Sequence, residues 1–509
     1  MDASSDGLDD FDDDPVEPGV WRFARADKAS VVIDAQDYFR FMQDAMLRAE
    51  QRILMIGWDF DTRIHLETGR RWWRKGTDRS HPSRLGSFIL WLNRHRPGLD
   101  IKMLKWGMGM IPMALRGSMA LDLLRWAPRR RIDFKWDSAH PMGACHHQKI
   151  VVIDDQLAVC GGIDMTRGRW DTRDHVEDDP RRRWSRWKQY GPWHDATMIM
   201  AGAIVKDLDE LGRDRWCRAG GDALTPVNPT TGKCWPEGLE PQFENVEIGI
   251  ARTRAAHENS PQVCEIADLF ERQIREARHF IYAESQYFAS RRIADAIARR
   301  MAEPDPPEVL IVHPANADGW LEQQAMDHAR AQLVRTLGEV DQAGRFNLYV
   351  PYTGETPIYV HSKIMIVDDA IIRIGSANMN NRSMGLDSEC DVFIDARRPG
   401  NAHARGAIAN LRHSLLAEHC GLKIDEVPRL IEQAGSMHAM IQALGQERTR
   451  TLRRFDLKQL NGMAETLAES AMLDPERPDE LLEPFAKGGL FRKGMFLSRI
   501  RNRTRKKAA

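Results

Sequence analysis

One chemical pattern occurs twice in this chain of 509 residues. Both copies read His-x-Lys-x-x-x-x-Asp and consist of His147, Lys149 and Asp154, and of His361, Lys363 and Asp368. A single copy is weak evidence for a site, because roughly one chain in twenty of this composition would contain it by chance. Two copies, each followed by a strand and a pair of small residues at the same distance, are strong evidence.

Apolar residues fill the gap between the lysine and the aspartate, at residues 150–153 and 364–367. Such a run predicts a buried strand, in which residues two apart point to the same face, so the imidazole and the ammonium group should project together. The aspartate falls where the apolar run stops, beside a second aspartate. We therefore expect it to fix the backbone of a turn rather than to touch substrate.

A returning strand then brings small and polar residues toward each copy. They are Gly161, Gly162 and Asp164 in the first copy, and Gly375, Ser376 and Asn378 in the second. Small residues let backbone N–H groups approach an anion, and a hydroxyl or an amide adds a donor. We expect a phosphate-binding surface here, although Asp164 could repel a phosphate where Asn378 would bind it.

Two such units facing each other would form a phosphoryl-transfer site. One histidine can attack phosphorus while the other protonates the leaving alcohol and then deprotonates the incoming water or alcohol. An unperturbed histidine pKa near 6.5 allows the two rings to hold opposite protonation states at neutral pH. The two lysines would neutralise the charge on the phosphoryl oxygens in place of a metal. Because no zinc or calcium spacing motif is present, we predict neither a metal nor another cofactor. His146 should point away from His147 and have a structural role.

Helix-like and strand-like segments alternate in both halves of the chain. A helix is expected from Ala35 and a strand from Ile53, and a similar helix and strand are expected from Ile266 and His279. Another helix and strand follow in each half, before the His/Lys/Asp segment. The repeated order predicts an α/β architecture that arose by tandem duplication.

Composition sets the expected boundaries of four segments. They are an acidic disordered leader at 1–20, a first α/β domain at 21–250, a second at 251–425, and a helical tail with a basic end at 426–509. The segment from Leu224 is dense in Pro, Gly and Asn, and we expect it to be the loop between the domains.

The totals exclude some classes of protein. A formal net charge of -1 argues against a surface built to hold polyanions, so no nucleic-acid partner is expected. The seven cysteines include no C-x-x-C pair and are expected to be reduced thiols. The acidic N-terminus does not look like a signal peptide, and no long uncharged apolar stretch is present. We expect a cytoplasmic or peripheral membrane protein, and we infer no obligate protein partner.

These motifs resemble those of the phospholipase D superfamily. The likeness extends to GGIDMTRGRWDTRDH from Gly161, GPWHD from Gly191, IYAESQYF from Ile281 and NRSMGLDSE from Asn381. These segments are similar to the eukaryotic-type branch, and the likeness covers about residues 28–420. The resemblance implies two tandem, similar α/β/α sandwich domains with the active site at their interface.

The resemblance also implies roles for individual residues. His147 would be the nucleophile that forms a phosphohistidine and His361 the acid and base, although the sequence leaves open which histidine attacks. Asp195 and Glu389 occupy the positions of the family's carboxylates that orient the two imidazoles, where a carboxylate fixes the tautomer and raises basicity. Some bacterial relatives act outside the cell, so the resemblance leaves secretion possible.

Four functions remain open. The first is a phospholipase D that releases the headgroup of a glycerophospholipid and has some capacity to transfer the phosphatidyl group to an alcohol. A phosphatidyltransferase of the cardiolipin synthase type would use the same site with a different acceptor. A nuclease is less consistent with the neutral net charge. A non-catalytic lipid-binding scaffold is the fourth, and the intact His and Lys in both copies argue against it.

Two segments interleave Trp with Arg or Lys, at 70–79 and 181–190. That composition suits the headgroup region of a membrane, where cations meet phosphates and indole rings lie at the apolar boundary. We favour 181–190 as part of the mouth of the cleft, because it lies between the first motif and Asp195. Solvated loops with Trp packed beneath them are the alternative. The tail from Gly488 is either a basic disordered end or an amphipathic membrane anchor.

Overall fold

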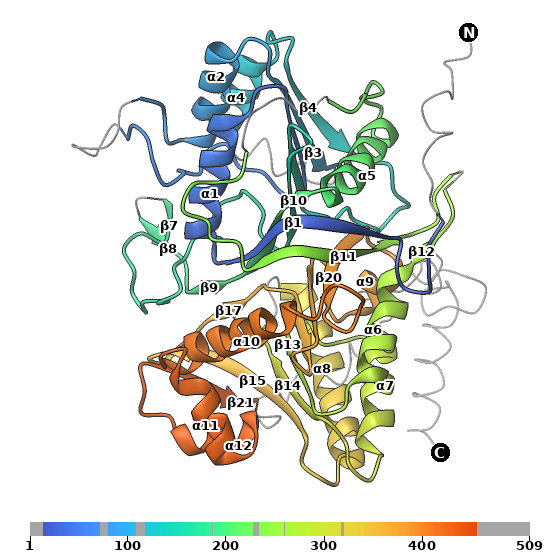
Figure 1. Cartoon of the computed structure of the whole chain (residues 1–509). Helices are drawn as coiled ribbons and strands as arrows, with labels where there is room; N and C mark the ends of the chain where they lie inside the picture. The colour runs from blue at the N-terminus through green and yellow to red at the C-terminus, as the bar shows by residue number, and fades with distance from the viewer. Residues whose placement is uncertain are drawn as a thin grey trace, which may run out of the picture.

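A large mixed β-sheet with helices on both faces forms the centre of the protein (Figure 1), which confirms the predicted α/β class. The computed structural model describes residues 14–71, 80–107, 118–185, 187–227, 234–258, 260–316 and 320–455.

The two halves of the chain contribute strands in the same spatial order. The strands of the first copy are β1 (Arg22–Ile33), β2 (Arg52–Gly57), β3 (Asp100–Trp106), β4 (Ile132–Asp137), β5 (Ile150–Ile153), β6 (Leu157–Gly161) and β10 (Ala196–Gly202). Those of the second copy are β11 (Phe243–Arg254), β13 (Phe280–Glu284), β14 (Glu308–Val312), β15 (Phe346–Thr353), β18 (Ile364–Val367), β19 (Ile371–Gly375) and β20 (Glu389–Asp395). The first copy runs β4-β3-β2-β5-β6-β10-β1 across the sheet and the second runs β15-β14-β13-β18-β19-β20-β11. In each copy the first three strands are parallel and the later pairings are antiparallel, as a tandem duplication predicts.

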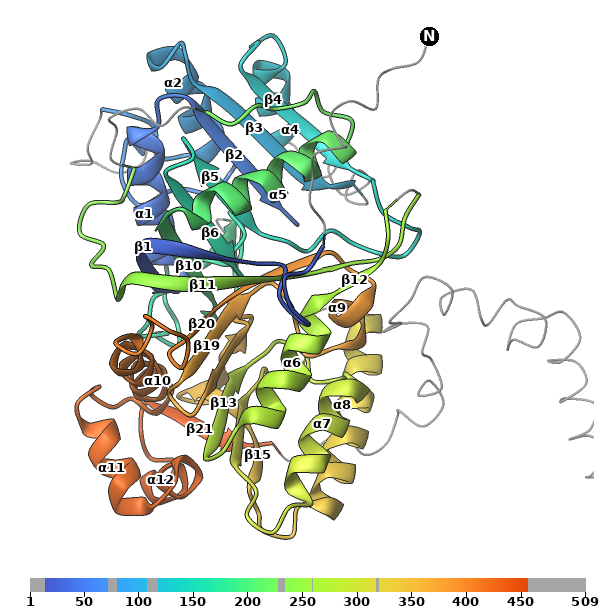
Figure 2. The same cartoon turned by 45° about the vertical axis from the view of Figure 1, so that its right-hand side comes forward.

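The two copies share one continuous sheet. Strand β11 pairs antiparallel with β1 on one side and with β20 on the other, so it lies between the copies (Figure 2). The boundary expected at residue 250 therefore falls inside a strand rather than in a linker. A hydrophobic core that contains residues of both copies lies beneath this junction.

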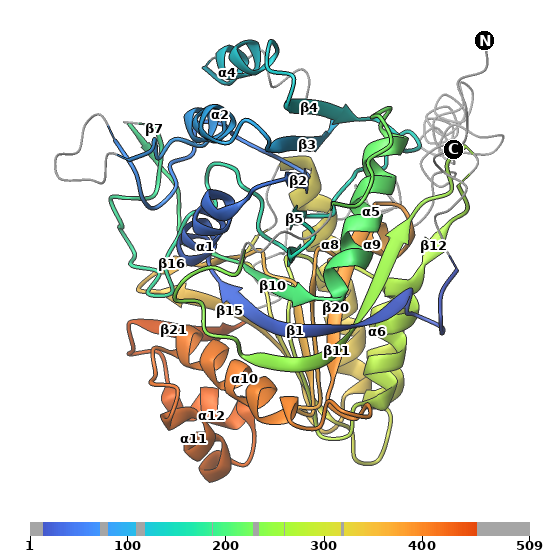
Figure 3. The same ribbon diagram turned by 45° about the horizontal axis from the view of Figure 1, so that its top comes forward.

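The helices cover both faces of the sheet, as binary patterning of the strands requires. They are α1 (Ala35–Arg48), α2 (Leu85–His95), α4 (Ser118–Trp126) and α5 (Ile204–Arg218) in the first copy, and α6 (Glu265–Glu276), α7 (Arg291–Met301), α8 (Trp320–Val340), α9 (Asn381–Gly385) and α10 (Ala404–Cys420) in the second. In β5, Ile150 and Val152 pack in the core beneath α5 and α10, whereas Val151 and Ile153 pack in a separate core with α1 and α2. This alternation follows from the period of two in a strand, and it places α1 and α5 on opposite sides of the first copy (Figure 3).

Short strands complete the described chain. They are β7 (Arg183–Ser185), β8 (Lys188–Gln189), β9 (Trp193–His194), β12 (Val263–Cys264), β16 (Thr356–Pro357), β17 (Tyr359–Val360) and β21 (Arg450–Arg454). After α10 come α11 (Glu426–Ala434) and α12 (Met437–Leu444).

Two details differ from the sequence prediction. The expected all-helical tail is wrong at β21, which pairs antiparallel with β15 and buries Leu452, so an available strand edge overrides the helical pattern. Disorder is wrong for the described end of the leader, residues 14–20, where Glu17 and Val20 form a β-bridge and Val20 is buried in a core with α6. The rest of the leader (1–13), residues 72–79 and the tail from Gly488 lie outside the described residues. All seven cysteines are free, as predicted.

Candidate active site

The histidine and the lysine of each motif lie in the extended segment immediately before β5 or β18. The backbone N–H of His147 donates to the carbonyl of Ser388 at 2.9 Å, and that of His361 donates to the carbonyl of His194 at 2.8 Å. Each bond joins one copy of the fold to the other. The two motifs are therefore held at the junction of the copies.

Each imidazole contacts a carboxylate from the opposite copy. His147 Nδ1 lies 3.1 Å from Glu389 Oε1 and 3.0 Å from Oε2, and His361 Nδ1 lies 2.7 Å from Asp195 Oδ2. Glu389 is the first residue of β20, and Asp195 lies between β9 and β10. Because the exchange is reciprocal, neither copy contains a complete His–carboxylate pair.

Burial keeps both imidazoles neutral. It lowers the pKa of His147 well below its ordinary value, and the charges of Lys149 and Lys363 lower it further. Burial likewise lowers the pKa of His361, and Lys363 and then Arg169 add to the shift. A neutral ring that donates Nδ1–H to a carboxylate has its lone pair on Nε2, which is the form that can attack phosphorus or accept a proton.

The two carboxylates have raised pKa values. Burial raises the pKa of Glu389 to about 7, against hydrogen bonds from Ser376 and Ser383 that favour the charged form. Burial raises the pKa of Asp195 to about 6, against the opposing charge of Lys363. Such shifts are frequent at functional sites, where charged groups are held out of water.

Both motif lysines are buried and face the same site. Lys149 Nζ donates to the carbonyl of His147 at 2.8 Å and lies 3.4 Å from Asp164 Oδ2. Lys363 Nζ donates to the carbonyl of His361 and, at 3.4 Å, to Gln286 Oε1. Burial lowers the pKa of Lys363 to about 7, and Lys149 lowers it further against Asp195. A bound anion would favour the charged form of Lys363, so the site is electrostatically suited to a phosphate.

The motif aspartates support the backbone instead of the site. Asp154 accepts hydrogen bonds from the backbone N–H groups of Glu50, Gln51 and Arg52 at 2.7–2.8 Å. Asp368 accepts the equivalent bonds from Arg278, His279 and Phe280 at 2.7–2.8 Å. Each aspartate thus joins the turn after the motif strand to the segment between a helix and its following strand.

The small residues expected to cradle phosphate have a different structural reason. A Cβ atom on Gly162 would collide with the carboxylate of Asp195, and one on Gly375 would collide with that of Asp391. A Cβ on Gly161 would collide with Thr197 in β10. Glycine at these positions makes room for neighbouring strands and buried carboxylates.

The other three members of that set have distinct surroundings. Ser376 Oγ donates to Glu389 Oε2 at 2.5 Å, and Asp164 lies against Lys149 as described above. Asn378 is buried, and its Oδ1 has no hydrogen-bond partner within the described residues. Of the six expected phosphate-binding residues, Asn378 thus has an uncommitted polar atom.

Three contributors were not singled out from the sequence. The guanidinium of Arg169 lies 4.0 Å from the ring centre of Trp193, and its charge lowers the pKa of His361. Ser383 Oγ donates to Glu389 Oε1 at 2.7 Å, and Gln286 Oε1 accepts a hydrogen bond from Lys363 Nζ. All three lie in segments that carry the family resemblance, but their spacing alone gives no chemical signal.

Aromatic rings line both histidines. Trp58 lies 6.5 Å from the ring of His147 and Trp193 lies 5.2 Å from that of His361, measured between ring centres. His146, by contrast, contacts Asp137 at 3.0 Å and receives Arg215 at 2.7 Å in a separate buried network. Its surroundings agree with a structural role.

Comparisons with known proteins point to one family. The profile of the family described as Phospholipase D matches residues 328–467, which include the second motif. Phospholipase D A of Dictyostelium discoideum is 25% identical over 485 residues, covering 80% of this chain and 36% of that protein. Phospholipase D alpha 1 of Zea mays is 27% identical over 408 residues, covering 56% of this chain and 50% of that protein. The chain thus spans between about a third and a half of the length of these two relatives.

Solved structures also resemble this chain. Phosphatidylserine synthase of Haemophilus influenzae matches with a TM-score of 0.49 and 12% identity, over 83% of this chain and 96% of that chain. The Nuc protein of Salmonella typhimurium matches with a TM-score of 0.23 and 16% identity, over 33% of this chain and 91% of that chain. Among the described residues, no helix has both the length and the apolar character needed to span a bilayer.

Proposed function

This chain belongs to the phospholipase D superfamily, and on that premise we propose that it is a phospholipase D. It hydrolyses the distal phosphodiester bond of glycerophospholipids and yields phosphatidate and the free headgroup. The observation that supports this most directly is the reciprocal pairing of His147 with Glu389 and of His361 with Asp195, beside Lys149 and Lys363.

In the first step, Nε2 of His147 attacks phosphorus. The N–P bond forms as the bond from phosphorus to the headgroup oxygen breaks, and His361 transfers its Nε2 proton to that oxygen. Binding of the anionic substrate favours the protonated form of His361, because the negative charge of the substrate offsets the positive charges of the lysines, which otherwise lower the pKa of His361. The lysine ammonium groups stabilise the charge that spreads over the non-bridging oxygens.

In the second step, His361 accepts a proton from water as the water oxygen attacks phosphorus. The N–P bond breaks, phosphatidate leaves, and His147 returns to the neutral form. An alcohol in place of water gives transphosphatidylation, because the site needs only an O–H group to deprotonate.

The environments of the two carboxylates support this division of roles. The Glu389 carboxylate accepts hydrogen bonds from the hydroxyls of Ser376 and Ser383 as well as contacting Nδ1 of His147, so its charge is only partly directed at His147. Asp195 Oδ2 lies 2.7 Å from His361, closer than Glu389 lies to His147. The closer carboxylate stabilises an imidazolium more strongly, which suits His361 to be the acid.

Product analysis tests the proposal. Vesicles of phosphatidylcholine, with and without added ethanol, would be incubated with the full chain and analysed by mass spectrometry. We expect phosphatidate alone without ethanol and phosphatidylethanol as a second product with it. Substitution of His147 by Asn should abolish both products.

Other outcomes would replace the proposal. A dimeric lipid formed from phosphatidylglycerol, without net hydrolysis, would assign the chain as a phosphatidyltransferase. Degradation of single-stranded DNA with no lipid turnover would assign a nuclease. Lipid binding that persists without turnover in the wild type would assign a scaffold.

We also propose that the β7–β8 hairpin contacts the membrane surface. Trp187 is 87% exposed and Trp184 is 39% exposed, and basic residues flank both in the sequence. The hairpin leads within a few residues to β9 and Asp195. Indole rings there can enter the headgroup region while the lipid reaches the histidines.

A change at the tip of the hairpin tests this contact. Trp187→Ala should lower turnover of phosphatidylcholine vesicles by about tenfold, since burying a large apolar side chain at the interface contributes roughly 1.5 kcal/mol. Turnover of a short-chain lipid below its micelle-forming concentration should stay unchanged. Val176→Ala, at another exposed apolar residue, is the matched control. An equal loss on both substrates would show that Trp187 acts on the site rather than on the membrane.

A further inference from the structure

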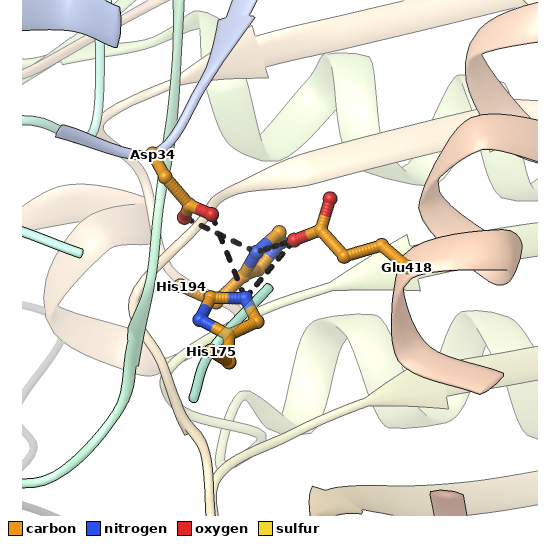
Figure 4. Close-up of side chains that lie close together, drawn as sticks. All are labelled: Asp34, His175, His194 and Glu418. Atoms are coloured by element: carbon orange, nitrogen blue, oxygen red, sulfur yellow. Dashed lines mark hydrogen bonds and ion pairs between the residues drawn. The ribbon is translucent and has the colours of Figure 1, made fainter. Parts of the chain in front are cut away.

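A second group of ionisable side chains is enclosed between the two copies, apart from the catalytic histidines. Asp34, His175, His194 and Glu418 each direct one donor atom toward a common point (Figure 4), and all four side chains are buried. Asp34 follows β1, His194 belongs to β9 and Glu418 belongs to α10, so both copies contribute. The chemistry proposed above uses none of these side chains.

We propose that these four residues bind a divalent cation of the zinc class at a structural site. His175 Nε2 lies 3.0 Å from Glu418 Oε1 and 3.5 Å from Asp34 Oδ2. His194 Nδ1 lies 2.8 Å from Glu418 Oε1 and 3.4 Å from Asp34 Oδ1. A tetrahedral ion with bonds of about 2.0–2.1 Å holds its ligands about 3.3 Å apart, close to these separations. Two imidazoles and two carboxylates are donors that zinc accepts, and the carboxylates balance its charge.

Two of the donor groups contain atoms that lack a hydrogen-bond partner. Asp34 Oδ2 and His194 Nδ1 are buried, and within the described residues neither makes a hydrogen bond, although each lies near a possible ion-pair partner: His175 Nε2 at 3.5 Å and Glu418 Oε1 at 2.8 Å. Burying a polar atom without a partner is unfavourable. Both atoms lie on the inner side of the cluster, where a cation would satisfy them together.

In each imidazole, the ring nitrogen that faces away from the cluster contacts a carboxylate, as is common for histidines that bind metals. His175 Nδ1 lies 3.0 Å from Asp171 Oδ2, and His194 Nε2 lies 2.8 Å from Glu284 Oε2. A histidine that binds a metal commonly donates its other N–H to a carboxylate, which fixes the tautomer and exposes the lone pair to the ion. With a carboxylate on both sides, the inner nitrogen of each ring needs either an extra proton or a metal.

Two of the four cluster residues, Asp34 and His175, have an unusual backbone conformation. Asp34 precedes α1, where an aspartate ordinarily caps the helix, but its side chain makes no cap hydrogen bond. Asp34 has a φ of 64° and His175 a φ of 43°, which non-glycine residues rarely adopt. Both residues are held away from their ordinary geometry with their side chains directed into the cluster.

The cluster is joined to the catalytic site through the backbone. Asp34 N–H donates to the carbonyl of Asp195 at 2.8 Å, and Asp195 N–H donates to Asp34 Oδ1 at 3.1 Å. A bound ion would therefore fix the strand that holds the Asp195 carboxylate against His361, without touching substrate. Sequence motifs did not predict this site, because its four donors are spread from residue 34 to residue 418.

Metal analysis of the full chain, free of affinity tags and purified without chelator, tests the proposal. Mass spectrometry of the elements should find about one zinc-class ion per chain, as expected for a closed structural site. His175→Ala and Glu418→Gln should lose the ion. His95→Ala, at an exposed histidine, and His361→Asn, at the catalytic site, should both retain it.

A second measurement covers the case in which the cluster variants do not fold. Wild-type protein stripped with a chelator would be titrated with Co²⁺ and with Zn²⁺. Co²⁺ should give the intense visible absorption of a tetrahedral site, and Zn²⁺ should raise the Tm. Absence of bound metal, of the cobalt spectrum and of the Tm shift would overturn the proposal and leave two protonated imidazoles as the explanation. Loss of the ion from His361→Asn would also overturn it. None of these measurements depends on lipid turnover.

Discussion

At the scale of single residues, Lys149 and Lys363 are positive charges held where water has little access, since each is 4% exposed. Burying these charges is unfavourable in the free enzyme. For Lys363, burial lowers the pKa to about 7. Groups placed in advance around a developing charge need no reorganisation during the reaction, and removing one costs a large factor in turnover.

Lys363→Met should therefore lower kcat by about 100-fold or more, because it removes a preorganised charge while keeping side-chain volume. Turnover of phosphatidylcholine vesicles measures the effect, and circular dichroism checks the fold. Lys206→Met, at an exposed lysine of α5, should leave kcat unchanged. Near wild-type kcat in Lys363→Met would mean that another cation stabilises the phosphoryl oxygens.

The protonation of Glu389 should set the acidic limb of the pH profile. Burial raises its pKa to about 7, and the Ser376 and Ser383 hydroxyls oppose this shift. A carboxyl group that has gained a proton accepts Nδ1–H more weakly and can itself donate to Nδ1, so the tautomer of His147 with a free Nε2 is less populated. Activity should therefore fall as the pH decreases through about 7.

Ser383→Ala should move this limb to higher pH, because it removes a hydrogen bond that favours the charged carboxylate. A lost hydrogen bond to a charge corresponds to roughly 0.5–1 pH unit. The pH dependence of kcat/KM measures the shift, with Ser414→Ala in α10 as a buried-serine control. A limb that stays in place, or moves to lower pH, would assign it to a group other than Glu389.

Sequence reasoning reached some of these residues and not others. The repeated spacing identified the His and Lys pairs, because strand geometry alone places residues two apart on one face. The phosphate-binding role expected for Gly162 and Gly375 competes with a packing reason, since each leaves room for a carboxylate. Ser383 could not be predicted, because its contact with Glu389 depends on the turn formed by α9.

At the scale of elements, the motif aspartates tie the motif strands to the preceding helix–strand unit. Asp368 accepts three backbone N–H groups and has a φ of 54°, which aspartate and asparagine tolerate better than most residues. The expected placement of these aspartates in a turn agrees with these contacts.

Asp368→Asn should lower stability by about 1–3 kcal/mol, because hydrogen bonds to a charged acceptor become weaker ones to a neutral amide. Urea unfolding measures the change, and kcat of the folded variant should stay within about threefold of wild type, since the side chain is remote from the reacting atoms. Asp295→Ala, at an exposed position of α7, is the control. A 100-fold loss of kcat with unchanged stability would instead place Asp368 in the chemistry.

The order of elements was also accessible from sequence, because helix and strand periods differ and the order recurs in both halves. The pairing between strands that are distant in the sequence could not be predicted from it. Strand β21 forms because β15 offers an edge, and β11 joins two copies that sequence analysis separated at residue 250. Both outcomes depend on tertiary contacts that no local pattern encodes.

At the scale of the whole molecule, the duplication produces one site from two halves. Asp195 of the first copy acts on His361 of the second, and Glu389 of the second acts on His147 of the first. Residue types and the family resemblance identified all four, but the sequence could not show which carboxylate serves which ring. The crossed arrangement makes the roles of the carboxylates separable by experiment.

A substrate with a good leaving group separates them. A p-nitrophenyl phosphodiester needs little acid assistance to form the phosphohistidine, but hydrolysis of that intermediate still needs a base. Asp195→Asn, which weakens His361 as the base, should thus give a rapid burst of p-nitrophenol followed by turnover about 100-fold slower than wild type. Glu389→Gln, which weakens His147 as the nucleophile, should slow the burst itself.

Mass spectrometry at alkaline pH, where phosphohistidine survives, would locate the trapped group. We expect the trapped group on His147 in Asp195→Asn. In this variant His147 can still attack phosphorus, but His361 is too weak a base to hydrolyse the intermediate quickly. A group on His361, with the burst retained in Glu389→Gln and lost in Asp195→Asn, would reverse the assignment of the two histidines while leaving the crossed pairing intact. A burst that responds equally to both substitutions would mean that the carboxylates do not act on separate rings.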